Sequence, residues 1–169
     1  MLKLNKFQII YFAAWILCLL ALAISLFFME DYLQLEPCPL CTVSRLIVAT
    51  LALVFLLAVL QNPKPLGQKL YAALALLFIG AGIGVSARHI WLQSLPAELV
   101  PGCTPDIQYL FDRFPLSEAL QTILNSSGEC ADVSWTFLGL TIPQQTLLFF
   151  IVLLILVIIA FVKTPRRAQ

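Results

Sequence analysis

The chain has 169 residues, of which 61% are hydrophobic and only 11% are charged. Soluble domains average about 45 to 50% apolar and about 25% charged residues, so this composition excludes an ordinary soluble domain and indicates an integral membrane protein. The net charge is only +1, and the distribution of the charges along the chain is more informative than their sum.

Four long apolar runs predict an all-α membrane protein, a four-transmembrane-helix bundle forming a single membrane domain over residues 1–169. About 20 helical residues cross a hydrocarbon core about 30 Å thick, which places the spans at roughly 8–29, 42–61, 69–88 and 144–163. The first run is longer than the apolar core of a signal peptide, about 7 to 15 residues, and no small-residue cleavage site follows it. We therefore expect it to be retained as a span.

The charges predict which side of the membrane each connection faces. All nine acids fall in the connections after the first and third spans. Lys and Arg accumulate on the cytoplasmic side of membrane proteins, so we expect both termini and the 61–69 loop to be cytoplasmic. The basic residues that support this orientation are Lys3, Lys6, Lys64, Lys69, Lys163, Arg166 and Arg167.

The outer connection over about 89–143 is much longer than a typical link of about 4 to 6 residues, and long ordered loops often carry function. Within this outer loop, apolar residues at i, i+3, i+4, i+7 and i+8 predict a short amphipathic helix that lies on the bilayer surface. Turn-forming residues surround Cys103 and Cys130 on either side of it, so we expect both thiols to be accessible. The apolar positions are Leu116, Ala119, Leu120, Ile123 and Leu124.

Two further features of the spans indicate packing and not chemistry. Gly80 and Gly84 in the third span have the small-xxx-small spacing that allows a neighbouring helix to approach closely. Cys18, in the middle of the first span, is expected to be a small packed hydrophobe.

The strongest chemical signal is the pair Cys38 and Cys41, separated by Pro39 and Leu40 at the start of the second span. In such pairs the pKa of the reactive thiol is commonly lowered, especially at a helix start or beside a cation. Arg45 lies one helical turn after Cys41 and provides that cation. The pair is therefore a candidate redox centre at a depth that a lipid-soluble carrier reaches.

Four outer thiols allow three disulfide pairings, which the sequence does not resolve. Proximity favours Cys38 with Cys41 and leaves Cys103 for Cys130, so a non-catalytic bundle with two structural disulfides is an alternative. Zinc is disfavoured because 26 residues separate Cys103 from Cys130 and an oxidising compartment disfavours free thiolates; we expect no metal site.

His89, the only histidine, has two interpretations. It is either an interfacial residue with a satisfied ring, or it converges with Arg45 and Cys41 on a quinone, whose carbonyl oxygens gain negative charge on reduction.

Several segments together resemble one family. They cover nearly the whole chain, and four cysteines in this order on a four-span topology are a specific match to DsbB, the bacterial disulfide bond formation family of the inner membrane. The matching segments are Cys38-Pro39-Leu40-Cys41 with Arg45, Arg88-His89-Ile90-Trp91, Cys103, Ser127-Gly128-Glu129-Cys130, and Trp135 to Leu140 with Pro143.

The resemblance implies a quinone-dependent protein-disulfide oxidase that reoxidises a DsbA-like periplasmic thiol oxidase. It implies redox-active disulfides Cys38–Cys41 and Cys103–Cys130, with Cys103 attacked by reduced DsbA and Cys38 exchanging with Cys130. It further implies that Cys41 faces the ring of ubiquinone or menaquinone, with Arg45 binding the quinone and His89 nearby. A paralogue that serves a different periplasmic client is an alternative within the family.

Overall fold

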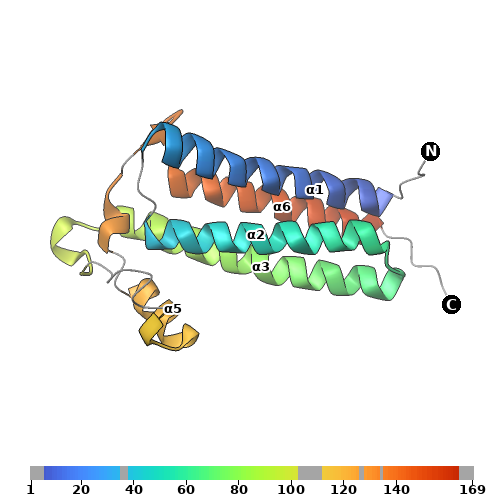
Figure 1. The fold of residues 1–169 in the computed structure, drawn as a ribbon. Helices are drawn as coiled ribbons and strands as arrows, with labels where there is room; N and C mark the ends of the chain where they lie inside the picture. The colour runs from blue at the N-terminus through green and yellow to red at the C-terminus, as the bar shows by residue number, and fades with distance from the viewer. Residues whose placement is uncertain (1–5, 35–37, 103–111, 126–127, 134, 164–169) are drawn as a thin grey trace.

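The computed structural model describes residues 6–34, 38–102, 112–125, 128–133 and 135–163. Its main elements are four long helices (Figure 1), each apolar enough to cross a membrane. Helix α1 (Lys6–Ala23) continues as a π-helical segment, η1 (Ile24–Tyr32). The others are α2 (Pro39–Gln61), α3 (Pro65–Gln93) and α6 (Ile142–Lys163). The predicted four-helix membrane bundle is confirmed.

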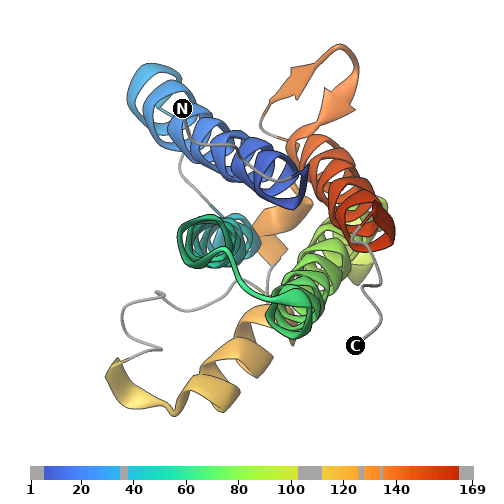
Figure 2. The same ribbon diagram turned by 90° about the vertical axis from the view of Figure 1, so that its right-hand side faces the viewer.

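The four helices form a ring in the order α1, α2, α3, α6, as the end-on view in Figure 2 shows. Each contributes a fully buried large side chain to one continuous core, and the rings of Tyr11 and Phe55 meet edge to face at 5.3 Å. Cys18 lies in this core, completely buried. Leucines and isoleucines cover the outward faces of the same helices, as lipid contact requires. The buried residues from the four helices are Tyr11, Phe55, Ile79 and Phe150.

The close helix approach in α3 occurs at Gly82 and not at Gly80 or Gly84. A Cβ atom at Gly82 would lie 2.3 Å from the ring of Phe150 on α6, whereas Gly80 and Gly84 have nothing within 4 Å of that position. The prediction from the small-xxx-small spacing is therefore wrong. The spacing identifies a face of the helix, but here that face points away from the bundle.

All four helical spans are longer than predicted, and the extensions of α2 and α3 affect the candidate site. Helix α2 begins at Pro39, with Cys38 as its N-cap, because proline fits the first helical position, where its missing N–H has no partner to lose. Helix α3 has 29 residues, or about 43 Å at 1.5 Å per residue, and continues past the predicted end at 88 to Gln93. His89 is therefore a helical residue inside the bundle end.

The connections after the first and third spans lie at one end of the bundle, and the short connection between α2 and α3 lies at the other end, with both chain ends (Figure 1). The connections include two short 3₁₀ turns, η2 (Ala97–Leu99) and η3 (Gly128–Ala131). Strands β1 (Thr136–Phe137) and β2 (Leu140–Thr141) form a small antiparallel hairpin. Leu138 and Gly139 have φ of 54° and 78°, as the two-residue turns that match strand twist require. The sequence analysis missed this hairpin because Leu-Gly is a weaker turn signal than Asn-Gly.

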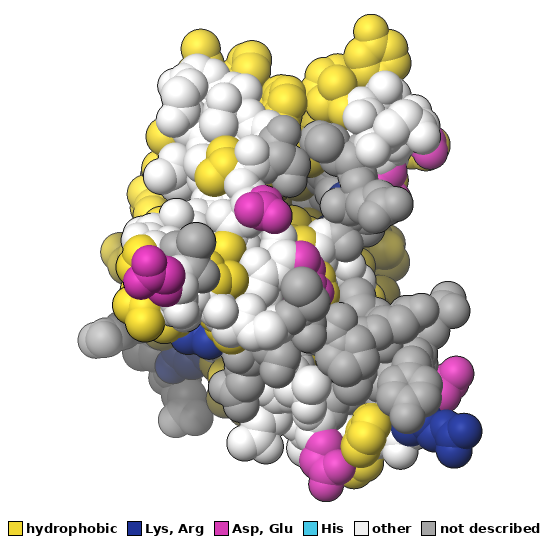
Figure 3. Space-filling view, turned by 90° about the vertical axis from the view of Figure 1, so that its left-hand side faces the viewer, with side chains coloured by type: hydrophobic (Ala, Val, Ile, Leu, Met, Phe, Trp, Pro, Cys, Tyr) yellow, Lys and Arg dark blue, Asp and Glu magenta, His cyan; other side chains and the backbone are white. Residues whose placement is uncertain are grey.

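The predicted amphipathic helix is present as α5 (Leu116–Asn125). Its Ile123 is 1% exposed and packs with Leu40 of α2, Leu92 of α3 and Cys130 of η3 in a second, smaller core. Ile123, on the apolar face of α5, therefore contacts the end of the bundle. Figure 3 looks onto this end, where acidic side chains are spread over the surface and basic ones are few.

Candidate functional site

Cys38 and Cys41 lie side by side at the first turn of α2. Their sulfur atoms are 2.9 Å apart, and the backbone N–H of Cys41 donates to the Cys38 sulfur at 3.3 Å. This sulfur separation is longer than the about 2.03–2.05 Å of a disulfide, and both residues are free thiols. The structure thus presents the expected Cys38–Cys41 pair in its open, dithiol form.

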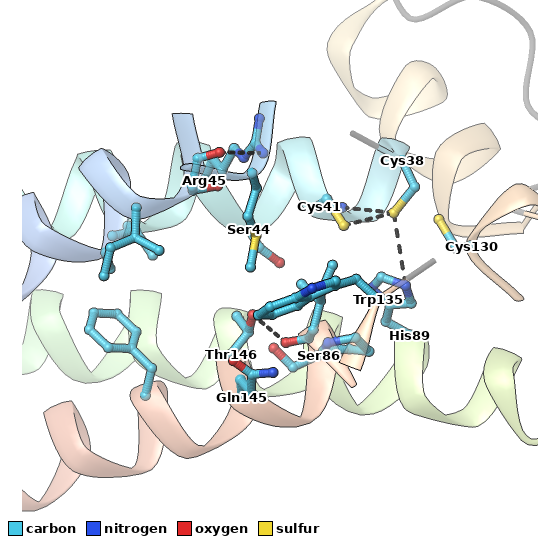
Figure 4. Close-up of a pocket in the computed structure, with 18 of the residues that line it drawn as sticks. Cys38, Cys41, Ser44, Arg45, Ser86, His89, Cys130, Trp135, Gln145 and Thr146 are labelled. Atoms are coloured by element: carbon cyan, nitrogen blue, oxygen red, sulfur yellow. Dashed lines mark hydrogen bonds between the residues drawn. The ribbon is translucent and has the colours of Figure 1, made fainter. Parts of the chain in front are cut away.

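Cys38 also contacts two groups that are distant in the sequence. Its Sγ lies 3.8 Å from Nε2 of His89 and within 4.8 Å of the Cys130 sulfur. In Figure 4, Cys130 approaches Cys38 from the side opposite Cys41. Cys38 therefore stands between the two other thiols.

Cys130 is only 1% exposed, so the prediction of an accessible loop position is wrong for this residue. The reason is the tight packing of η3. The N–H of Gly128 donates to the carbonyl oxygen of Gly102 at 3.3 Å, and a Cβ at Gly128 would lie 2.1 Å from the carbonyl oxygen of Pro101. Cys103 lies outside the described residues, but this contact joins its neighbour Gly102 to the turn that carries Cys130.

His89 is 5% exposed and projects from α3 into the space between α2 and η3. Besides its contact with Cys38, the ring lies against the backbone of Cys130. Its nearest partners are therefore the two cysteines that face each other. A role of His89 in binding a quinone stays a prediction.

The pKa of the Cys38 thiol is raised to about 12, opposite to the direction expected for a thiol at a helix start. The interaction with Cys130 raises it most, burial raises it further, and the interaction with Cys41 acts in the opposite direction. In the open form a thiolate at Cys38 is disfavoured because the interaction with Cys130 favours the protonated thiol, and burial removes water that would solvate the charge.

Arg45 is paired with an acid that the sequence analysis did not connect to it. Its Nη1 donates to Oε1 of Glu30, and its Nη2 donates to the carbonyl oxygen of Ser25 at 3.3 Å, both in η1. This ion pair joins the start of α2 to the end of the first span. Arg45 still lines the same cavity as the cysteines, with its charge shared by Glu30.

A cavity of about 340 Å³ connects these groups. The sequence analysis missed several polar side chains that line it, among them Ser44, Ser86, Trp135, Gln145 and Thr146 (Figure 4). Ser86 is 1% exposed, and its Oγ has no hydrogen-bond partner among the described residues. The sequence contains a signal for Ser86, since it is a polar residue one helical turn before His89 in a mostly apolar span.

Comparison with known proteins identifies the family. The family model described as "Disulfide bond formation protein DsbB" matches residues 7–160. The chain belongs to the DsbB family. It is 49% identical to disulfide bond formation protein B of Nitrosococcus oceani over 85% of each chain. It is 44% identical to that of Hahella chejuensis over 90% of this chain and 94% of the relative. Family membership gives this chain a role in protein disulfide bond formation.

In this DsbB-family chain, the structure brings together the candidate residues that it describes. Cys38, Cys41, His89 and Cys130 lie around one end of the cavity, and Arg45 lines the same cavity one turn along α2. Three of the four predicted redox cysteines thus share one site. A bundle held together by two separate structural disulfides does not need to bring these three cysteines together.

Proposed function

We propose that the chain is a quinone-dependent protein-disulfide oxidase that reoxidises a DsbA-like periplasmic thiol oxidase. Electrons would pass from the partner to Cys103 and Cys130, then to Cys38 and Cys41, and then to quinone. The observation that carries the proposal is the position of Cys38, whose sulfur is 2.9 Å from that of Cys41 and within 4.8 Å of that of Cys130. A relay between two cysteine pairs needs one thiol that reaches both.

The relay balances as successive thiol-disulfide exchanges, in each of which a thiolate attacks a disulfide sulfur and the other sulfur leaves. Reduced partner thiols would open the Cys103–Cys130 disulfide through Cys103 and leave as a disulfide. The released Cys130 would then attack Cys38 in its disulfide with Cys41, which frees the Cys41 thiolate. Attack by Cys103 on Cys130 would restore the loop disulfide and leave Cys38 and Cys41 reduced. Two electrons and two protons move per partner disulfide.

The cavity fits a quinone ring in size and in chemistry. Its volume, about 340 Å³, lies in the range of about 300–1,000 Å³ of small-molecule sites, which combine apolar walls with a few polar groups. Leu22, Val48 and Phe149 contribute apolar wall, and the unpartnered Ser86 hydroxyl offers a hydrogen bond to a carbonyl oxygen. When bound, a quinone would supply an acceptor for two electrons and two protons.

Cys41 and Arg45 line this cavity, which supports Cys41 as the electron-donating thiol and Arg45 as the cation that orients a carbonyl oxygen. A guanidinium has five N–H donors, and the contacts with Glu30 and Ser25 leave donors for a ligand. His89 would hold the side chains of Cys38 and Cys130 at a fixed distance from each other through its contacts with both.

We place the protein in the bacterial inner membrane as a multi-pass protein, with both termini cytoplasmic and the end that carries α5 in the periplasm. Both chain ends lie at the bundle end opposite the cysteines (Figure 1). Acidic side chains lie on the cysteine end (Figure 3), which fits the exclusion of basic residues from outer loops. A soluble periplasmic partner would approach this end.

The test is to follow quinone absorbance with the purified full chain, a reduced DsbA-like protein and a soluble quinone. The parent chain should consume quinone, and Cys41→Ser should not exceed the uncatalysed rate. Arg45→Leu should weaken the apparent quinone affinity by about 10- to 100-fold, since hydrogen bonds to charged groups contribute about 1.5–3 kcal/mol.

Glu30→Gln is the matched control, because it removes the ion pair with Arg45 and keeps the guanidinium. It should change the apparent quinone affinity much less than Arg45→Leu. Full turnover by Cys41→Ser, or no quinone consumption by the parent chain, would show that the proposed electron path is wrong.

A further inference from the structure

The open dithiol form brings together three side chains that have the chemistry of a metal site. The ligand atoms of Cys38, His89 and Cys130 all lie within 4.8 Å of one another, and Cys38 Sγ is 3.8 Å from His89 Nε2. In tetrahedral zinc sites, Zn–S bonds of about 2.3 Å and Zn–N bonds of about 2.0–2.1 Å put neighbouring ligand atoms about 3.5–3.8 Å apart. The three atoms therefore need to move by less than about 1 Å to share one ion.

We propose that the reduced chain binds one thiophilic divalent cation, such as Zn²⁺, through Cys38, His89 and Cys130. This is not a resident cofactor, and the cation enters only when both thiols are free. The spacing of the four outer cysteines is unsuitable for a zinc site of four cysteines, so no metal was predicted from the sequence. The helix α3 histidine, 51 residues from Cys38, supplies the third ligand.

The surroundings of His89 match those of a metal ligand. Metal-binding histidines usually donate their second ring nitrogen to a carboxylate or a backbone carbonyl, which fixes the ring and its tautomer. The His89 ring lies against the backbone of Cys130, and its Nε2 is 3.8 Å from Cys38 Sγ. The residue is buried with only 5% of its surface exposed, so the ring is held in place before an ion arrives.

The charges balance in this buried site. Binding Zn²⁺ to Cys38 and Cys130 displaces one proton from each thiol, and the two thiolates neutralise the ion beside the neutral imidazole. Cys41 does not belong to the three-residue cluster, although its sulfur is 2.9 Å from that of Cys38. The three residues fill three of the four positions of a tetrahedral site.

Cation binding and electron transfer exclude each other at these residues. A disulfide that includes Cys38 or Cys130 removes a thiolate ligand, and a bound cation occupies the sulfur atoms that must exchange. If the chain works as the oxidase proposed above, a thiophilic cation inhibits it by holding the reduced form. This consequence rests on the proposed function, whereas the binding itself does not.

The binding is tested with Co²⁺ as a spectroscopic probe, on the anaerobic, detergent-purified full chain without quinone or partner. The reduced chain should give the thiolate-to-cobalt charge-transfer band and the visible bands of a tetrahedral site, at one Co²⁺ per chain, and Zn²⁺ should displace them. Loss of a residue that only hydrogen-bonds to a metal ligand costs about 10- to 100-fold in metal affinity. Loss of a ligand itself should weaken binding at least as much, in each of the variants Cys38→Ser, Cys130→Ser and His89→Ala.

Two matched variants keep the parent affinity if the assignment is right: Cys18→Ser in the bundle core and Cys41→Ser. The last separates the two proposals, because it should abolish quinone consumption and retain the cobalt spectrum. The oxidised parent chain, identical in sequence, should bind no Co²⁺. Binding to the oxidised chain, binding that survives Cys38→Ser or Cys130→Ser, or no thiolate band in the reduced chain would each overturn the inference.

Discussion

Cys38 is the described cysteine that lies closest to all the other groups of the site, namely Cys41, Cys130 and His89. It caps α2, accepts the N–H of Cys41, and meets both Cys130 and His89. The cap requires an extended backbone, which Cys38 adopts with φ −68° and ψ 160°, and the following proline favours this conformation. Pro39 therefore contributes twice, since it starts the helix and directs the Cys38 side chain toward its partners.

The raised pKa of Cys38, about 12 in the open form, predicts an unusual pH dependence. Only the thiolate is alkylated, and an ordinary thiol has a pKa of about 8.5. The rate of Cys38 alkylation in the reduced chain, measured by mass spectrometry, should therefore still rise with pH above about 9. Cys130→Ala removes the largest cause and should shift the profile to lower pH. A plateau near the ordinary thiol pKa in the parent chain would contradict this account.

Ser86 is the second residue whose environment makes a prediction. Its buried hydroxyl lacks a partner among the described residues and lines the cavity. A neutral hydrogen bond contributes about 0.5–1.5 kcal/mol, so Ser86→Ala should raise the apparent KM for quinone about two- to tenfold. Exchange between Cys130 and Cys38, followed without quinone, should not change.

Thr146→Val is the comparison for Ser86→Ala. Thr146 lines the same cavity, but its hydroxyl already donates to the carbonyl oxygen of Ile142 at 2.9 Å. The effect on the apparent KM for quinone should therefore be smaller. Equal effects from the two variants would show that Ser86 has no special contact with the ligand.

Among the elements, α3 has the most roles. It packs against α2 and α6, carries Ser86 and His89 to the cavity, and provides Leu92 to the small core beneath α5. Its position against α6 depends on Gly82, where a Cβ would meet the Phe150 ring at 2.3 Å. The absence of a side chain at Gly82 thus sets how closely α3 and α6 approach.

Gly82→Ala should destabilise the bundle by about 1–3 kcal/mol, the usual cost of overpacking a filled core. Gly84→Ala is the matched control, because the Cβ position there is open and alanine favours helix over glycine by about 1 kcal/mol. Thermal unfolding in detergent should show a lower Tm for Gly82→Ala and an unchanged or higher Tm for Gly84→Ala. The reverse order would mean that α3 and α6 pack through a different face.

At the scale of the whole molecule, the bundle separates its two ends. The start of α2, which carries Cys38 and Cys41, lies at one end with α5 and the hairpin, and both termini lie at the other (Figure 1). Lys64 caps α3 and Lys69 lies near its start, at the terminal end, whereas the exposed acids Asp31, at the end of η1, and Asp132, two residues after Cys130, lie at the other end. This asymmetry predicts the orientation in the membrane.

Reporter fusions test that orientation. Green fluorescent protein fused after Gln169, or inserted at Gly67, should fluoresce, and alkaline phosphatase at the same sites should be inactive, as expected for cytoplasmic positions. A fusion after Asp132 should give the opposite pair of results. Active phosphatase at Gln169 would place the cysteine end in the cytoplasm and would contradict access to a periplasmic partner.

Much of the fold was predictable because hydropathy and helix signals are local. A span is recognised from about 20 consecutive residues, so all four were found, with errors of a few residues at their ends. The Cys38–Cys41 pair was equally visible, since its spacing is itself the signal. The hairpin and the contact at Gly82 were not found, because they depend on a weak turn sequence and on which face of α3 meets α6.

The sequence by itself determined the membrane class, the four spans, the candidate thiols and the resemblance to the DsbB family, since each of these is a property of composition or spacing. Only the tertiary structure decided that Cys130 is buried beside Cys38, that His89 lies between them, and that Arg45 pairs with Glu30. The physical reason is that these contacts join separate elements, and the packing of α1, α2, α3 and η3 sets the distances between their side chains. The chemistry of the site depends on those distances.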